Sequence, residues 1–193
     1  ARMKKEEPSA VERYLGEAEK GLQKMSLAIN SILNVANPNR ILKAQDTLYN
    51  HLREAVKILL LQAKEHRVEV KLSLPPRFEE LAFGSDLYTV FINLIKNAIQ
   101  AMPQGGQLDI TGLDLGDRLE IHFSDTGVGI APEHLPDIFK PFFSTKDQGQ
   151  GLGLGLTICQ KIVQRYQGQI EVNSTFGQGT DFIVHLPVPP RKG

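Results

Sequence analysis

The chain has 193 residues and carries 22 Lys and Arg against 22 Asp and Glu, so its formal net charge is zero. No overall field therefore draws it towards nucleic acid or an acidic membrane, and its length suits one hydrophobic core with a small additional segment. Its single cysteine, Cys159, excludes an internal disulfide and fits a reducing compartment.

Nothing in the sequence predicts a membrane span or an export signal. The longest uninterrupted apolar run is residues 58–61, far below the length that crosses a bilayer, and there is no signal-peptide pattern. Because the chain begins with Ala1 rather than Met, we expect a cytoplasmic fragment of a longer protein. A membrane anchor elsewhere in that protein is compatible with the sequence.

Residues 9–37 are predicted to form one long helix, which begins at a capping box made by Ser9 and Glu12. Its apolar residues then recur in steps of four and three, as in a coiled coil: Val11, Leu15, Ala18, Leu22, Met25, Ile29, Ile32 and Ala36. A narrow apolar stripe of this kind requires partner helices in a bundle; a helix packed on its own domain is the alternative. The Asn-Pro-Asn sequence at 37–39 predicts the end of the helix and a short linker.

The elements after residue 40 do not alternate as βαβ units, which excludes a Rossmann or P-loop domain. We predict helices at 46–64, 86–101 and 153–167, and strands at 67–74, 107–113, 118–124, 169–173 and 180–187. Asp46 and Ser85 are the expected N-caps of the first two helices. Three helices and five strands in this order favour an α+β fold, a two-layer α/β sandwich in which a mixed five-stranded sheet carries the helices on one face.

A carboxylate and two glycines follow the predicted strand at 118–124. Asp125 would be held rigidly at the strand end, and Gly127 and Gly129 would let the backbone turn where side chains would obstruct a ligand. An ordinary strand-to-loop turn is the alternative, because Asp and Gly are common turn residues.

Three amide side chains share one stripe of the predicted helix at 86–101, namely Asn93, Asn97 and Gln100. Asn is unfavourable inside a helix because its side chain competes for backbone hydrogen bonds. The stripe therefore indicates either a row of polar groups that lines a pocket or a solvent-exposed face.

Alternate glycines lead directly into the predicted helix at 153–167: Gly149, Gly151, Gly153 and Gly155, with Gln150, Leu152 and Leu154 between them. Backbone N–H groups without obstructing side chains at a helix N-terminus form an anion site, most naturally for phosphate. The sequence is neither a P-loop, which ends in Lys, nor the G-x-G-x-x-G dinucleotide motif. A flexible linker is the alternative, which the intervening leucines disfavour.

Five segments of the chain resemble the N, G1, F, G2 and G3 boxes of the catalytic, ATP-binding domain of sensor histidine kinases, a family of the GHKL or Bergerat-fold superfamily. The segments are residues 93–98, 125–130, 139–146, 151–156 and 177–180. The resemblance covers about residues 47–186 and implies the Bergerat fold. The heptad helix resembles the second helix of the family's dimerisation and histidine-phosphotransfer hairpin. The expected domains are therefore a partial dimerisation helix and linker at 1–39 and an ATP-binding catalytic domain at 40–193.

The resemblance implies ATP and Mg²⁺ as cofactors, with these nucleotide-binding residues: Asn93, Asn97, Gln100, Asp125, Gly127, Gly129, Ile130, Lys146, Gly151, Leu152, Gly153, Leu154, Gly155, Leu156 and Thr180. Asp125 matches the carboxylate that accepts a hydrogen bond from the adenine amino group. Thr180 matches a residue that helps to hold the base through a shared water. Asn97 matches the Mg²⁺ ligand, and Asn93 and Lys146 are the expected catalytic residues.

Two positions depart from the family pattern. Gln100 stands where the family often has a phosphate-binding Lys, and Leu152 stands where Thr or Ser is usual. These departures concern the details of a mobile ATP lid, expected at 131–150, and leave the nucleotide assignment unchanged.

The resemblance implies transfer of the γ-phosphoryl group to a histidine in two-component signal transduction. Related gyrase, heat-shock chaperone and mismatch-repair ATPases carry a Glu four residues before the metal-binding Asn as general base. This chain has Asn93 there, which cannot take a proton at neutral pH, so transfer to a protein side chain is favoured over hydrolysis. An anti-sigma-type serine kinase and a non-catalytic ATP-binding module are the alternatives.

None of the five histidines has the sequence context of the family's phospho-acceptor. The acceptor histidine is therefore expected on the dimerisation hairpin of the same protein, outside this chain. The expected partners are that hairpin, in a homodimer of the full-length kinase, and a response regulator downstream. Contacts with nucleic acid or with a membrane are not expected for this fragment.

Overall fold

The computed structural model describes residues 45–145 and 152–188. In chain order these form β1 (Gln45–Thr47), α2 (Leu48–Glu65), β2 (Val68–Ser73), the 3₁₀ helix η1 (Pro76–Glu79), β3 (Ala82–Gly84), α3 (Asp86–Ala101), β4 (Gly106–Asp114), β5 (Arg118–Asp125), α4 (Gly155–Arg165), β6 (Gln169–Thr175) and β7 (Gly179–Pro187). The predicted helix at 9–37, the domain boundary near residue 40, and Lys146 and Gly151 lie outside the described residues. Within the described ranges, no helix has both the length and the apolar character needed to cross a bilayer.

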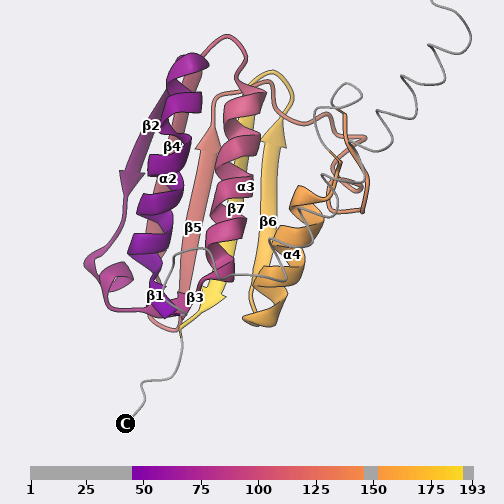
Figure 1. Cartoon of the computed structure of the whole chain (residues 1–193). Coiled ribbons are helices and arrows are strands. Elements are labelled where there is room, and N and C mark those ends of the chain that lie inside the picture. Colours follow the sequence, from indigo (N-terminus) through magenta and orange to yellow (C-terminus); the bar gives the residue numbers. More distant parts are fainter. Residues whose placement is uncertain (1–44, 146–151, 189–193) are drawn as a thin grey trace, which may run out of the picture.

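The five longer strands form one mixed sheet in the order β2-β4-β5-β7-β6. β2 runs parallel to β4, and the other neighbouring strands are antiparallel. Helices α2, α3 and α4 all lie on one face of this sheet (Figure 1). The predicted α+β fold, a two-layer sandwich with the helices on one face, is therefore confirmed.

The structure contains a second, two-stranded sheet that the sequence analysis did not predict. β1 and β3 pair antiparallel, with Gln45 opposite Gly84, and the N–H group of Leu48 extends the contact by donating to the carbonyl of Leu81 at 2.9 Å. Each strand has three residues, too few to show an alternating pattern. This small sheet fastens the first described residues of the chain to the segment immediately before α3.

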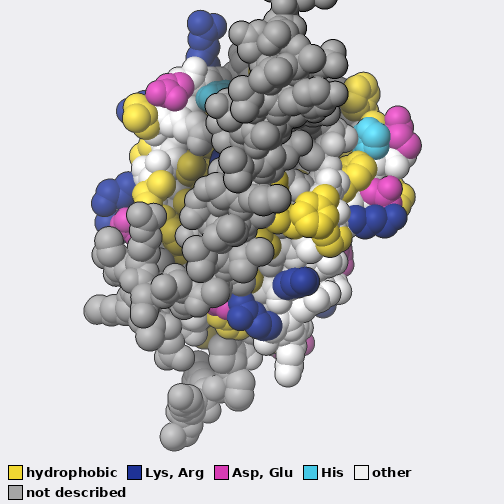
Figure 2. All heavy atoms as spheres, turned by 45° about the vertical axis from the view of Figure 1, so that its right-hand side comes forward, with side chains coloured by type: hydrophobic (Ala, Val, Ile, Leu, Met, Phe, Trp, Pro, Cys, Tyr) yellow, Lys and Arg dark blue, Asp and Glu magenta, His cyan; other side chains and the backbone are white. Residues whose placement is uncertain are grey.

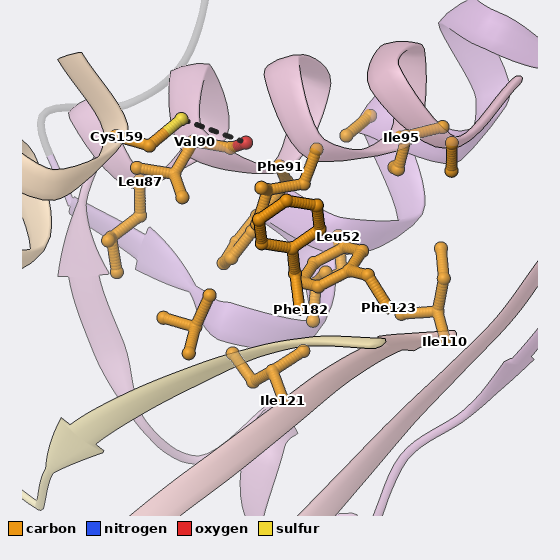
Figure 3. Packing of buried hydrophobic residues seen from close by; sticks show 14 of the residues in the cluster. Leu52, Leu87, Val90, Phe91, Ile95, Ile110, Ile121, Phe123, Cys159 and Phe182 are labelled. Carbon is orange, nitrogen blue, oxygen red and sulfur yellow. Dashed lines mark hydrogen bonds between the residues drawn. The ribbon is translucent and has the colours of Figure 1, made fainter. Parts of the chain in front are cut away.

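The hydrophobic core lies between α3 and the centre of the sheet. The inward-facing residues of β5 alternate along the strand, and all are buried: Leu119, Ile121 and Phe123. The ring of Phe123 stacks on that of Phe91 in α3, with centroids 6.0 Å apart (Figure 3). On another side of α3, the Cys159 thiol of α4 donates to the carbonyl of Val90 at 3.8 Å, and burial raises the pKa of this thiol. Cys159 is therefore a packing residue rather than a reactive thiol.

The predicted starts of the helices need correction. Thr47, not Asp46, is the N-cap of α2: its hydroxyl accepts a hydrogen bond from the N–H group of Asn50 at 3.2 Å. The Asp46 carboxylate instead binds the Thr47 N–H group and the Asn50 side chain. Ser85 precedes α3 as predicted, but its side chain makes no capping hydrogen bond. α4 begins two residues later than predicted because Gly153 has a left-handed φ of 66°, which a right-handed helix excludes.

Candidate nucleotide-binding site

Asp125 is the last residue of β5 and is 8% exposed. Its Oδ1 atom accepts a hydrogen bond from the N–H group of Gly127 at 2.8 Å, and the backbone N–H group of Thr180, its register partner on β7, also binds the carboxylate. Burial raises the pKa of this carboxyl; the two N–H groups oppose that shift, and the nearby Asp181 adds to it. A buried carboxylate that retains free lone pairs is suited to accept a hydrogen bond from a ligand.

The two glycines after Asp125 are required by the protein itself. A Cβ atom at Gly127 would lie 2.5 Å from the carbonyl oxygen of Ala101, at the end of α3. Gly129 has a left-handed φ of 67°, and a Cβ atom there would overlap the carbonyl oxygen of Thr175. These contacts give the glycines a packing role beside the predicted one of leaving room for a ligand: they allow the loop to pack closely on α3 and on the end of β6.

Ser174 is a residue of this site that the sequence analysis missed. Its hydroxyl accepts a hydrogen bond from the N–H group of Ile130 at 2.8 Å and lies 2.9 Å from the hydroxyl of Thr180. It also donates to the carbonyl of Gly179 at 3.0 Å. Along β6 the half-buried positions are Ile170, Val172 and then Ser174. A polar residue that continues an inward-facing apolar series was the available signal.

Asn93, the first residue of the amide stripe of α3, faces the beginning of α4. Asn93, Asn97 and Gln100 are all half-buried, so the alternative of a fully solvated face is excluded. The Asn93 Nδ2 group donates to the carbonyl of Thr89 at 2.8 Å. Its Oδ1 atom lies 3.1 Å from the position that a Cβ atom would take at Gly155, the first residue of α4. The amide oxygen of Asn93 is therefore directed at the helix N-terminus.

The segment before α4 is held in place by residues 139–143. The N–H group of Phe142 donates to the carbonyl of Gly153 at 3.0 Å, and the Thr157 hydroxyl donates to the carbonyl of Phe139 at 2.9 Å. Leu152, Leu154 and Leu156 are half-buried, which excludes a flexible linker over the described part of the glycine motif. The first turn of α4 carries no acidic residue, so its backbone N–H groups are not neutralised locally and suit an anion.

The described surface of the domain combines several types of side chain. Basic and hydrophobic side chains lie side by side on the described part of the face that comes forward in Figure 2. The exposed hydrophobic residues of the described chain include Val128, Phe142 and Phe176.

Among the described residues there is no group of three or more His, Cys, Asp or Glu that could hold a metal ion.

The two ends of the site are joined by α3. The carbonyl of Ala101 accepts a hydrogen bond from the N–H group of Val128, beside Asp125, whereas Asn93 lies against the start of α4. Eight residues separate these two points on α3, or about 12 Å of helix. The geometry suits an extended ligand that has a hydrogen-bond donor at one end and an anion at the other.

The fold and this site define a nucleotide-binding domain of the Bergerat type. The model of a family described as histidine kinase-, DNA gyrase B-, and HSP90-like ATPase matches residues 84–190, more than half of the chain. The chain belongs to this family. The nucleotide-free catalytic domain of the histidine kinase ThkA has the same fold, with a TM-score of 0.65 and 28% identity over 76% of this chain and 97% of that domain.

Two curated relatives are named as kinases. Sporulation kinase E of Bacillus subtilis (strain 168) is 35% identical over 173 residues, which cover 86% of this chain and 23% of that protein. Sensor histidine kinase ZraS of Escherichia coli (strain K12) is 32% identical over 173 residues, which cover 88% of this chain and 36% of that protein. The chain therefore spans between about a quarter and just over a third of the length of these relatives.

Proposed function

We propose that this chain is the catalytic domain of a sensor histidine kinase, which binds ATP with Mg²⁺ and transfers the γ-phosphoryl group to a histidine on a dimerisation hairpin. The observation that carries the proposal is the buried Asp125 carboxylate at the end of β5, linked by α3 to the N-terminus of α4. The family of the chain and the names of its relatives support the same activity.

The adenine end of the nucleotide would be recognised by Asp125. The exocyclic amino group of adenine is a donor, whereas guanine presents a carbonyl oxygen at that position, which a carboxylate would repel. The Thr180 hydroxyl, which is buried beside Ser174, would hold a water shared with the base. The backbone around Ile130 is fixed by the same serine, so the base would enter a preorganised site.

The phosphate end would be held by α4 and by the amide stripe of α3. Mg²⁺ is a hard cation that prefers oxygen ligands, and phosphate oxygens and waters would surround most of it; the amide of Asn97 would supply the protein oxygen. When bound, Mg²⁺ would neutralise charge on the phosphates during transfer. The first N–H groups of α4, from Gly155 onwards, would bind the terminal phosphates, and the half-buried Gln100 would add a neutral donor.

Phosphoryl transfer to a protein is favoured over hydrolysis of ATP. The side chain that would need to be a general base is Asn93, and an amide does not take a proton at neutral pH. Its Nδ2 group is already bound to the carbonyl of Thr89. Asn93 would therefore position the backbone groups at the start of α4 and would not activate water. Lys146 is proposed to add positive charge at the phosphates.

The contacts of the five histidines support a phospho-acceptor outside this chain. His51 is fully buried, with its Nε2 atom 3.2 Å from the carbonyl of Phe83. His122 and His185 lie against carboxylates on strands of the sheet, at 2.9 and 3.3 Å. His66 binds a carbonyl at the end of α2, and His134 packs on an aromatic ring. The acceptor is therefore proposed on a separate helix, in a cytoplasmic homodimer that passes the phosphoryl group to a response regulator.

A transfer assay with a separately supplied acceptor tests this function. The chain is incubated with radiolabelled ATP, Mg²⁺ and a histidine-bearing dimerisation hairpin of a relative, and acid-labile label on the hairpin is expected. Omission of the hairpin is the matched control and should leave the chain unlabelled. Binding of ATP without labelling of any hairpin would instead indicate a non-catalytic nucleotide-binding module, and label on a serine would indicate the serine-kinase alternative.

A further inference from the structure

Three elements of the domain meet at one tyrosine hydroxyl, at the opposite end of α4 from the phosphate site. The Tyr166 hydroxyl, just after α4, donates to Oδ1 of Asp86 in the first turn of α3. The backbone N–H group of Gly84, the last residue of β3, also binds this hydroxyl. Arg165 lies 3.0 Å from the other oxygen of Asp86. We call Gly84, Asp86, Arg165 and Tyr166 the Tyr166 cluster.

The tyrosine is the principal member of this cluster. Arg165 is 56% exposed, and an exposed ion pair contributes little. Tyr166 is half-buried, its ring packs edge-on against Phe83 with centroids 5.8 Å apart, and burial followed by the bond to Asp86 raises the pKa of its hydroxyl. A hydrogen bond from this hydroxyl to a carboxylate, partly shielded from water, is stronger than the solvent-exposed ion pair beside it.

The cluster joins the incoming chain to α4. β3 carries Phe83 and Gly84 and pairs with β1, the first described strand. A displacement of β1 would therefore move Gly84 through the hydrogen bonds between β1 and β3. From the cluster, α4 extends 11 residues back to Gly155, or about 16 Å. In the middle of α4, Cys159, Ile162 and Val163 are buried in the core, and the Cys159 thiol donates to the carbonyl of Val90. A rigid helix that is held at its middle pivots there. A tilt at the Tyr166 end is therefore transmitted to the N–H groups at the other end.

We propose that Tyr166, acting through Asp86, is a positioning residue that sets the direction of α4 and thereby the affinity of the domain for the anionic end of its nucleotide. The inference rests on the proposed function, because it takes the α4 N-terminus as the phosphate site. It also makes β1 and β3 the structural link through which the preceding segment of the chain acts on that site. The adenine end, held by β5 and β7, is outside this link.

The first test compares two ligands in the full chain. Tyr166→Phe removes the hydroxyl and keeps the ring, and the affinity for ATP should fall about three- to tenfold, as for loss of one hydrogen bond. The affinity for adenosine, which lacks phosphates, should stay the same. Tyr88→Phe removes a hydroxyl from α3 outside the cluster and should change neither affinity. Equal losses for ATP and adenosine in Tyr166→Phe, or no loss for ATP, would overturn the proposal.

The second test approaches the same contact from β3. A Cβ atom at Gly84 would overlap the Tyr166 hydroxyl and lie 3.0 Å from Oδ1 of Asp86, so Gly84→Ala should weaken ATP binding selectively as well. In the Tyr166→Phe background that hydroxyl is gone, and Gly84→Ala should then cause little further loss. Additive losses in the double variant would contradict a shared contact.

A third measurement distinguishes failure of the inference from failure of the proposed function. Hydrogen exchange in the nucleotide-free chain should be faster in Tyr166→Phe than in the wild type, both in β3 and in the first turns of α4. If the wild-type chain binds no ATP, the proposed function fails, yet this exchange pattern still reports whether the cluster holds α4. Unchanged exchange in α4 would refute the positioning role whatever the nucleotide.

Discussion

Replacing Asp125 by Asn should disrupt adenine recognition while the size of the side chain is preserved. The carboxylate accepts the N–H groups of Gly127 and Thr180 and has lone pairs left for a ligand donor. An amide has only one acceptor oxygen, so its NH₂ group must face either a backbone N–H group or the adenine amino group. Loss of one buried hydrogen bond, with a donor left unpaired, costs about 1–3 kcal/mol, which corresponds to roughly 5- to 150-fold weaker ATP binding.

The contribution of the adenine amino group can be isolated by a double comparison. Calorimetric titration of wild type and Asp125→Asn with ATP and with inosine triphosphate, which lacks the amino group, gives a coupling energy between that group and the carboxylate. Asp181→Asn is the matched control, because Asp181 binds His122 and Ser124 of β5, whose side chains lie on the opposite face of the sheet from that of Asp125. It should leave the preference for ATP unchanged. Equal loss of affinity for both nucleotides in Asp125→Asn would refute the adenine assignment.

The same carboxylate predicts a dependence on pH. Burial raises the pKa of Asp125 above its ordinary value, so the folded domain takes up this proton more readily than the unfolded chain does. As the pH falls through the folded-state pKa, this group's contribution to folding stability rises, while its ability to accept the adenine hydrogen bond is lost. The affinity for ATP should therefore decline at a pH above the usual range of an Asp, and Asp125→Asn should remove that part of the profile.

Three further outcomes follow from the described geometry. Asn97→Ala should slow phosphoryl transfer to a supplied hairpin more than it weakens adenosine binding; normal transfer would exclude Asn97 as the metal ligand. Gly129→Ala should lower the urea midpoint of unfolding strongly, because its Cβ atom would overlap the carbonyl of Thr175. The control is Gly116→Ala, at a φ of 91° with open space around it, which reports the backbone strain alone. Equal midpoints for the two variants would exclude the overlap. The chain incubated alone with radiolabelled ATP should carry no acid-labile phosphate, and its appearance would place an acceptor within the chain.

Most of the fold could be predicted because its long elements have clear periodicity. The alternation of Leu119, Ile121 and Phe123 fixed β5 and its inward face, and the broad apolar face of α3 fixed its contact with the sheet. The strands β1 and β3 and the short helix η1 have three or four residues each. Elements of that length are determined by tertiary contacts, such as the pairing of Gln45 with Gly84, and leave no periodic signal.

The site was predicted in its chemical groups but not in its packing. Asp125 and Asn93 stand out in the sequence because a carboxylate at a strand end and amides inside a helix are costly unless they are used. Thr180 was predicted only from the resemblance to the family. Ser174 was missed because a serine near the end of a strand is commonplace. The packing role of Gly127 could not be predicted, because its neighbour, the carbonyl of Ala101, is brought there only by the fold.

The helix α3 connects both ends of the nucleotide site, so the number of residues between Asn93 and Ala101 sets the distance between them. One residue inserted between Asn93 and Ala101 would rotate one end of the site against the other by about 100° and separate them by a further 1.5 Å or so. No adjustment of a side chain compensates for such a change. Variation in length among members of this family should therefore avoid that stretch and gather at places such as the β4–β5 hairpin, where Gly116 faces open space. The distance from Asn93 to Ala101 along α3 should therefore match the distance between the two ends of the nucleotide.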